Sequence, residues 1–217
     1  MDEFEIRREK MVTEQIQRRG ITNPAVLQAM RSVPRHLFVN TELQENAYGD
    51  YPLPIGCDQT ISQPYIVALM TSLLNLVGTE KVLEVGTGSG YQAAVLSLLA
   101  REVHTVELIP QLAARAKETL HNLGYANVTV HQSDGSLGWQ PASPYDAILV
   151  TASAPKAPSP LLAQLKPEGK LVIPVGGRGT QWIELWSQEN GVWQSEEILP
   201  VAFVPLRGVH GWQNWED

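Results

Sequence analysis

Three alternating glycines follow an acidic residue near the middle of the chain, and this spacing is suited to binding a nucleoside. Glu84 lies in the short apolar run 82–85. The glycines are Gly86, Gly88 and Gly90, and an apolar stretch of helical type comes after them. Glycine allows a positive φ and a close approach of the backbone to a ligand. Because the following helix would present free N–H groups to the same ligand, the pattern predicts a binding loop between a strand and a helix.

Two departures from the dinucleotide-binding fingerprint indicate which ligand this loop takes. The fingerprint requires a third glycine or an alanine where this chain has Tyr91. In addition, the carboxylate of Glu84 would repel a pyrophosphate and attract a cation. S-adenosylmethionine is the nucleoside ligand that carries an ammonium and a sulfonium instead of phosphates. We therefore expect S-adenosylmethionine as the cofactor, S-adenosylhomocysteine as its product, and no appreciable binding of NAD.

Polar residues also follow the later strands of the expected sheet, where ligands of open α/β sheets bind. Glu107 ends the second strand, and its carboxylate can accept hydrogen bonds from both ribose hydroxyls. Asp134 follows the third strand and could accept a hydrogen bond from an adenine amino group. Each residue taken singly could be a solvated loop residue, but their order and spacing together favour a cofactor site. The expected cofactor-binding residues are Glu84, Gly86, Thr87, Gly88, Ser89, Gly90, Glu107, Leu108, Asp134, Gly135 and Thr151.

Strands alternate with helices from residue 81 onward, which predicts a parallel sheet with right-handed crossovers. Asn190-Gly191 then predicts a hairpin, so the sheet should end in antiparallel strands. The expected strands are 81–85, 103–107, 127–131, 146–150 and 170–174, then 181–187 and 192–198, and 201–204 could add another. The expected helices in this part are 90–100, 110–123 and 158–166.

The part of the chain before residue 80 has a different character. A helix is expected over 3–19, ending at Gly20, with Ile6, Met11, Val12 and Ile16 on its apolar side. A second helix should begin at Pro24, capped by Asn23, and run to about residue 32. Residues 40–63 lack periodicity and are expected to form a loop-rich cover, after which Pro64 begins a helix that runs to about Leu76.

These elements together predict the α/β class. The expected architecture is a Rossmann-like methyltransferase fold, with a mostly parallel, doubly wound sheet that ends in antiparallel strands and with N-terminal helices. We expect a single methyltransferase domain over 1–217. Its parts would be N-terminal helices and a substrate-side cover at 1–78, a cofactor-binding core at 79–175, and antiparallel strands and a tail at 176–217.

Composition is typical of one soluble, enzyme-sized domain. The 217 residues are 43% hydrophobic and carry a formal net charge of −7. Such a chain has no basic surplus to neutralise phosphates, which argues against a nucleic-acid partner. The charged N-terminus predicts no signal peptide, no apolar run approaches a membrane span, and the single cysteine, Cys57, suits a reducing compartment. We expect a cytoplasmic monomer with no membrane partner.

A second motif lies immediately before the helix that begins at Pro64. It contains Thr60 and Ser62. Pro64 at the first helical position makes Gln63 or Ser62 the cap, so Ser62 could simply cap the helix. Alternatively, its hydroxyl could bind a carboxylate beside the free N–H groups of the helix N-terminus. Composition and spacing leave both interpretations open.

Motifs over nearly the whole chain resemble those of the protein-L-isoaspartate O-methyltransferase family. The segment 60–65, Thr-Ile-Ser-Gln-Pro-Tyr, is close to diagnostic, whereas many methyltransferases share the glycine loop 82–91. Two departures are Asp58, where the family commonly has glycine, and the tail 208–217, which matches no pattern. The other matching segments are Asn23-Pro24 with Val26-Leu27, Val33-Pro34-Arg35 with Phe38-Val39, Asp134-Gly135 with Gly138-Trp139, Tyr145-Asp146-Ala147-Ile148 with Val150-Thr151, and Phe203-Val204-Pro205-Leu206.

The resemblance implies methyl transfer from S-adenosylmethionine to the free carboxylate of L-isoaspartyl residues in damaged proteins and peptides, which starts their repair through collapse of the ester to a succinimide. It implies Ser62 as the active-site residue, with Thr60 and the segment 204–206 shaping the peptide pocket. A carboxylate with a pKa of about 4 is already ionised at neutral pH, so no general base is needed. Positioning can account for roughly 7–11 kcal/mol of barrier lowering. Ser62 is therefore expected to orient the carboxylate and not to act as a covalent nucleophile.

Three other functions compete with this interpretation. One is another methyltransferase that acts on amino groups of nucleic acids or on a small molecule. Methylation of exocyclic amines resembles enzymes with an Asn/Asp-Pro-Pro-aromatic loop after the fourth strand, whereas residues 151–155 read Thr-Ala-Ser-Ala-Pro. A non-catalytic binding module would bind the cofactor without turnover on any isoaspartyl peptide. A metal enzyme is disfavoured, and no metal is expected, because the five histidines are scattered and no paired cysteines occur.

Overall fold

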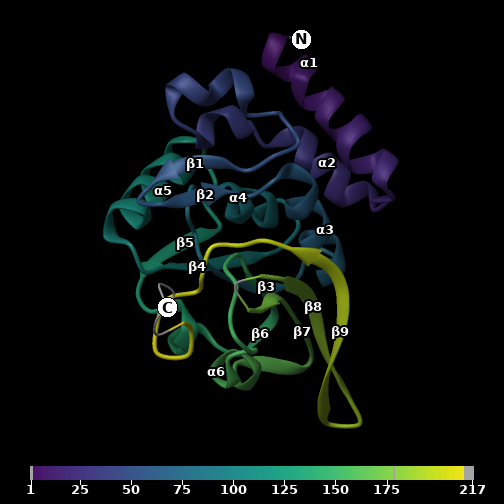
Figure 1. The fold of residues 1–217 in the computed structure, drawn as a ribbon, viewed down its shortest axis with the longest axis vertical. Helices are drawn as coiled ribbons and strands as arrows, with labels where there is room; N and C mark the ends of the chain where they lie inside the picture. Colours follow the sequence, from purple (N-terminus) through teal and green to yellow (C-terminus); the bar gives the residue numbers. More distant parts are fainter. Residues whose placement is uncertain (1, 178, 213–217) are drawn as a thin grey trace.

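A single large sheet forms the centre of the protein, as seen in the computed structural model, which describes residues 2–177 and 179–212. Its seven strands lie in the order β5-β4-β3-β6-β7-β8-β9 (Figure 1). Strands β3 to β7 pair parallel with one another, and β8 pairs antiparallel with both β7 and β9. The strands are β3 (Lys81–Val85), β4 (Glu102–Glu107), β5 (Val128–Gln132), β6 (Tyr145–Val150), β7 (Leu165–Gly176), β8 (Gln181–Glu189) and β9 (Val192–Val201). The expected Rossmann-like α/β class is confirmed.

The direction in which the strands are added reverses at β3, and this reversal positions a ligand site. Strands β4 and β5 lie on one side of β3, and β6 and β7 lie on the other. Ligands of open parallel sheets bind beyond the carboxyl ends of the strands at such a reversal. The glycine loop follows β3 directly, so it lies at this point.

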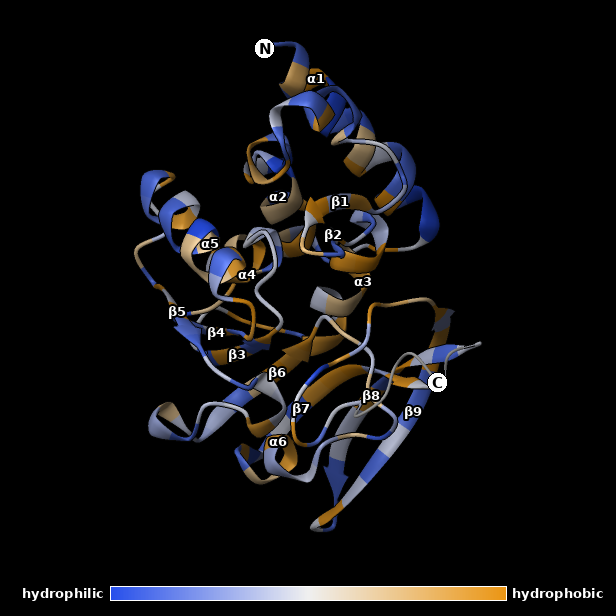
Figure 2. Cartoon of the chain, turned by 60° about the vertical axis from the view of Figure 1, so that its left-hand side comes forward, coloured by the Kyte–Doolittle hydropathy of each residue, from blue (hydrophilic) through white to orange (hydrophobic). Residues whose placement is uncertain are grey.

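Two hydrophobic cores cover the two faces of the sheet. Neighbouring residues of β3 point to opposite faces, because Val82 packs in one core and Leu83 in the other. The first core includes residues of α4 (Tyr91–Ser97) and α5 (Pro110–Asn122), and the second includes Leu161 of α6 (Ser159–Ala163). Figure 2 shows the hydrophobic colour concentrated on the central strands. A sheet covered by helices on both faces is the doubly wound arrangement.

The N-terminal helices lie at the end of the molecule opposite the tip of the β8–β9 hairpin (Figure 1). Helix α1 (Glu3–Lys10) continues through a π-helical segment, Met11–Ile16, and a short 3₁₀ segment that ends at Gly20, where φ is +95°. Met11, Val12 and Ile16 are buried, but Ile6 is 55% exposed, so its placement on the apolar side was wrong. Helix α2 (Pro24–Ser32) is capped by the Asn23 side chain, as expected.

The segment 40–63 is more ordered than expected, because it contains a two-stranded hairpin. Strand β1 (Leu53–Gly56) pairs antiparallel with β2 (Gln59–Ile61), and helix α3 (Pro64–Leu74) follows. The turn residues Cys57 and Asp58 both have positive φ, +52° and +57°. Hairpin turns of this kind usually carry Asn-Gly or Asp-Gly, and the Cys-Asp pair gave no such signal. Two short helical turns, Arg35–Phe38 and Thr41–Asn46, precede the hairpin.

The segment after β9 does not form the additional strand suggested for 201–204. β9 ends at Val201, and the side chain of Gln181 instead binds the backbone of Phe203, whose N–H donates to Gln181 Oε1 at 2.6 Å. Further along, Leu206 N–H donates to the carbonyl of Ser153 at 2.7 Å. This segment therefore crosses the carboxyl end of β6, where it can form a wall of a site.

Candidate active site

A cavity opens at the carboxyl ends of the central strands, between the glycine loop, the β1–β2 hairpin and the segment after β9. It encloses about 840 Å³ including space open to solvent. Its wall includes most of the residues predicted from the sequence. These are Thr60, Ser62, Glu84, Gly86, Thr87, Gly88, Ser89, Glu107, Leu108, Gly135 and Thr151.

The glycine loop has the positive φ values that its sequence predicts, +96° at Gly86 and +88° at Gly90. A Cβ atom at Gly86 would lie 2.3 Å from Thr151 Oγ1, so only glycine fits there. The Thr151 hydroxyl donates to the carbonyl of Gly86 at 2.6 Å and thereby holds the loop against β6. Gly90 does not line the cavity; it precedes α4 and lies close to Leu120 of α5, which gives it a packing role.

Glu84 is fully buried and only half satisfied by hydrogen bonds. Its Oε2 accepts a hydrogen bond from Thr105 Oγ1 at 2.6 Å, and its Oε1 has no partner among the described residues. Burial is the main cause that raises the pKa of Glu84 to about 8; the hydrogen bond from Thr105 opposes this shift, and the nearby charge of Glu107 contributes to it. A cation at Oε1 would satisfy the free oxygen and favour the ionised form. The site therefore fits the ammonium group expected of the cofactor.

Glu107 braces the same loop from β4. Its Oε2 accepts the N–H of Gly88 at 2.8 Å, and its Oε1 accepts the N–H of Ile109 at 2.9 Å. An ionised carboxylate has about four acceptor positions, so both oxygens can accept further hydrogen bonds from ribose hydroxyls. Glu107 thus has a structural contact in addition to the predicted ligand contact.

Asp134 lies outside the wall of the cavity, although Gly135 beside it is part of that wall. Its Oδ1 accepts from the N–H and the hydroxyl of Ser136, at 2.9 and 2.7 Å, and its Oδ2 accepts from Val209 N–H at 2.8 Å. A Cβ atom at Gly208 would lie 2.0 Å from Asp134 Oδ1. The carboxylate therefore anchors the start of the C-terminal tail, and the predicted contact with adenine stays a prediction. Tail residues 213–217, including Trp215, lie outside the described residues.

Ser62 lines the cavity immediately before α3. Gln63, and not Ser62, is the residue at the cap of α3, and no side chain caps that helix. The interpretation of Ser62 as a helix cap is therefore wrong. No hydrogen bond of the Ser62 hydroxyl occurs within the described residues, whereas the Ser62 carbonyl accepts from Arg35 Nη2 at 2.8 Å. Thr60, an exposed residue in the middle of β2, lines the same cavity.

Several residues of the cavity wall were not predicted from the sequence. Gln92 follows the glycine loop by two positions, and its Nε2 donates to Thr71 Oγ1 of α3 at 2.8 Å. Arg207 belongs to the C-terminal wall, next to the expected 204–206 segment. The place of Gln92 in the first turn of the helix after the glycine loop could have indicated it, but nothing local marks Arg207.

Residues 2–177 and 179–212 contain neither a candidate metal site nor a candidate membrane span. No group of three or more His, Cys, Asp or Glu side chains in these ranges could hold a metal ion. No helix in the same ranges has the length and apolar character needed to cross a membrane.

The chain is similar to known proteins along almost its entire length. The profile of the family described as protein-L-isoaspartate(D-aspartate) O-methyltransferase matches residues 6–211. Protein-L-isoaspartate O-methyltransferase 1 of Syntrophobacter fumaroxidans is 54% identical over 213 residues, which cover 98% of this chain and 100% of that protein. The corresponding protein of Desulfotalea psychrophila is 51% identical with the same coverage.

Two solved structures are also similar. One protein-L-isoaspartate O-methyltransferase has a TM-score of 0.86 and 28% identity, covering 94% of this chain and 67% of that one. A Plasmodium falciparum protein described as a putative protein-L-isoaspartate O-methyltransferase, in complex with S-adenosyl-L-homocysteine, has a TM-score of 0.80 and 26% identity, covering 92% and 98%.

Proposed function

Because the chain belongs to the protein-L-isoaspartate(D-aspartate) O-methyltransferase family, we propose that its cavity transfers a methyl group from S-adenosylmethionine to the free carboxylate of L-isoaspartyl residues in damaged proteins and peptides, which initiates their repair. One observation carries the assignment of residues. A single cavity joins a half-satisfied buried carboxylate, Glu84, and the glycine loop to the free hydroxyl of Ser62.

The cofactor half of the cavity is suited to a cationic nucleoside. Glu84 Oε1 would accept a hydrogen bond from the ammonium group, and Glu107 would accept from the ribose hydroxyls. Thr151 and Glu107 fix the backbone of the glycine loop through their hydrogen bonds with Gly86 and Gly88. When bound, S-adenosylmethionine supplies a methyl group on a sulfonium, an electrophile that a carboxylate oxygen can attack in line.

The substrate half of the cavity needs to position an anion and not to activate it. An isoaspartyl carboxylate is ionised at neutral pH, so the site requires no general base. Ser62 Oγ would donate a hydrogen bond to one carboxylate oxygen, and the Thr60 hydroxyl would contribute a second contact. These hydrogen bonds would hold the carboxylate oxygen in a near-attack geometry. Reactants held in this way react faster because their effective molarity is large.

We further propose that the enzyme is a cytoplasmic monomer that uses no metal. Methylation of an ionised carboxylate needs no Lewis acid to generate the nucleophile. The net charge of −7 argues against nucleic acid as a substrate. A single cysteine suits a reducing compartment.

The decisive assay uses two peptides that differ only in an isoaspartyl or an aspartyl linkage at one position. With labelled S-adenosylmethionine, the isoaspartyl peptide should accept label and the aspartyl peptide should not. Equal labelling of both would refute the proposed specificity. Binding of S-adenosylhomocysteine without turnover of either peptide would instead identify a non-catalytic binding module.

A further inference from the structure

Arg35 is a buried cation with no acidic partner among the described ion pairs. It lies in the helical turn Arg35–Phe38, and its side chain is completely inaccessible to solvent. Nη1 is buried and has no partner among the described residues. A buried charge without a carboxylate lowers stability compared with an apolar side chain of similar volume. Stability alone therefore does not explain why an arginine occupies this position.

The guanidinium of Arg35 connects three segments that are distant in sequence. Nε donates to the carbonyl of Ala47 at 2.7 Å, and Nη2 donates to the carbonyl of Ser62 at 2.8 Å. The carbon of the guanidinium lies 4.9 Å from the ring centroid of Tyr91. Tyr91 is the first residue of α4, directly after the glycine loop, and lines the cavity. Arg35 thus connects the Ser62 segment with the helix that follows the cofactor loop.

The segment that carries Ser62 needs support of this kind. It follows a turn in which Gly56, Cys57 and Asp58 all have positive φ. The Ser62 hydroxyl makes no hydrogen bond with any described residue that would fix its direction. The direction of the hydroxyl therefore depends on the backbone, and the hydrogen bond from Arg35 holds that backbone at Ser62 itself.

We propose that Arg35 is a positioning residue for methyl transfer, which fixes the Ser62 backbone against Tyr91 so that the serine hydroxyl meets the substrate carboxylate. This inference rests on the proposed role of Ser62. A displacement of about 1 Å at a reacting centre can lower a rate by about 100-fold. Lysine would not reproduce these contacts, because its donors all lie on one nitrogen, whereas Arg35 donates from both Nε and Nη2 with its planar guanidinium beside the Tyr91 ring.

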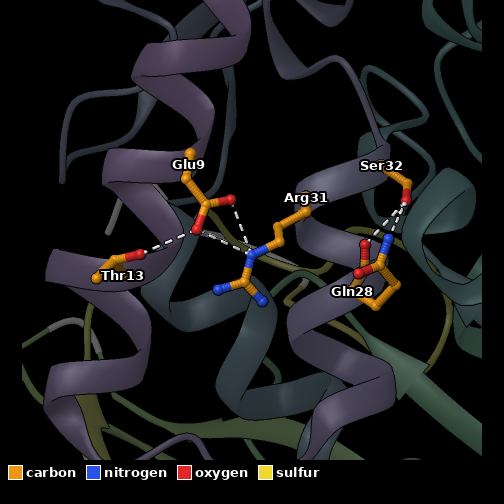
Figure 3. Close-up of polar contacts among 5 residues, drawn as sticks. All are labelled: Glu9, Thr13, Gln28, Arg31 and Ser32. Carbon is orange, nitrogen blue, oxygen red and sulfur yellow. Dashed lines mark hydrogen bonds and ion pairs between the residues drawn. The ribbon is translucent and has the colours of Figure 1, made fainter. Parts of the chain in front are cut away.

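The matched control is Arg31, which lies four residues earlier on α2. Its Nε donates to the Glu9 carboxylate at 2.9 and 3.1 Å (Figure 3), and neither residue lines the cavity. Arg31→Lys therefore makes the same replacement at a partly exposed arginine contact between N-terminal elements. We expect Arg35→Lys to lower kcat/KM for the isoaspartyl peptide at least tenfold and Arg31→Lys to change it less than twofold. The Kd for S-adenosylhomocysteine should stay within threefold in both, because Glu107 and Thr151 hold the glycine loop independently.

A double-mutant cycle with Ser62→Ala tests whether Arg35 acts through Ser62. If it does, Arg35→Lys should change kcat/KM less than threefold once Ser62 is alanine. If the fold-loss in kcat/KM of the double variant equals the product of the two single losses, the inference is overturned. Full activity of Arg35→Lys alone would also overturn it. If Arg35→Lys does not fold, as judged by circular dichroism, Arg35→Met takes its place in the cycle.

The proposed function and this inference fail in different ways. If Ser62→Ala keeps activity within twofold of the wild type, the role of Ser62 is lost and the inference with it. If the wild type methylates no isoaspartyl peptide, hydrogen exchange over residues 57–63 still tests the contact. Exchange there should be faster in Arg35→Lys than in the wild type, and unchanged exchange would overturn the inference.

Discussion

Replacing Glu84 by glutamine separates the charge of this side chain from its shape. Glutamine fills the same volume and keeps an acceptor for the hydroxyl of Thr105, which donates to Glu84 at 2.6 Å. It cannot carry the negative charge that the ammonium group of the cofactor requires. A hydrogen bond to a charged group contributes about 1.5–3 kcal/mol, or roughly a 10- to 100-fold change in Kd. We therefore expect Glu84→Gln to raise the Kd for S-adenosylhomocysteine at least tenfold.

The same substitution should have the opposite effect on the ligand-free protein. Burial raises the pKa of Glu84 from 4.5 to about 8, so between these values the folded chain keeps a proton that the unfolded chain has released. The free energy of unfolding therefore falls as the pH rises through this window. At 1.36 kcal/mol per pKa unit, the free energy of unfolding should have fallen by on the order of 5 kcal/mol when the pH reaches about 8. Glutamine is neutral throughout, so the variant should lack this loss and be the more stable protein near pH 8.

Urea unfolding of the ligand-free proteins between about pH 5 and 8 measures this difference, and calorimetry measures the Kd. The control is Glu118→Gln, which removes the same charge from an exposed position on α5. Subtracting the control removes the contributions of other titrating groups. The reasoning would be refuted by parallel stability profiles for Glu84→Gln and the wild type, or by a Kd that changes less than threefold.

Three further substitutions test other parts of the site. Glu107→Ala should raise the Kd for S-adenosylhomocysteine at least tenfold, because it removes charge-assisted bonds of about 1.5–3 kcal/mol and also frees the N–H of Gly88; an unchanged Kd would contradict both roles. Ser62→Ala should lower kcat/KM for the isoaspartyl peptide at least tenfold at saturating cofactor, and a change within about twofold, under 0.5 kcal/mol, would shift the carboxylate contact to Thr60. Asp58→Gly should raise the free energy of unfolding by about 0.5–1 kcal/mol in urea, since φ is +57° there and glycine adopts such values without steric cost. A less stable Asp58→Gly would show that the aspartate contributes a contact that outweighs the backbone strain.

The sequence was informative where the decisive interactions are local. A strand, a glycine turn and a helix start are each determined within a few residues, so the loop from Glu84 to Gly90 and the carboxylate of Glu107 were predicted in their correct places. The alternation of elements after residue 81 likewise predicted a mostly parallel sheet. For the same reason the fold class could be inferred from the pattern of residues alone.

Contacts between distant segments could not be predicted in this way. Asp134 binds Val209, 75 positions further along the chain, and this partner determines that its carboxylate faces the tail. Arg35 contacts Ser62 across 27 positions, and no spacing rule connects an arginine in a helical turn with a carbonyl after a hairpin. The β1–β2 hairpin was missed because Cys57 adopts a positive φ that its residue type rarely adopts, and Cys-Asp is not a usual hairpin-turn pair.

The turn of the β1–β2 hairpin also offers a direct way to observe the protein at work. Cys57 is the only cysteine of the chain, it is exposed, and it lies three residues before Thr60 in the cavity wall. A thiol-reactive fluorophore would therefore attach at one known place without any engineering of the sequence. Its emission would report in real time on solvent access at the rim as peptides arrive and leave. Single-turnover traces of this label could then separate the arrival of a peptide from the chemical step.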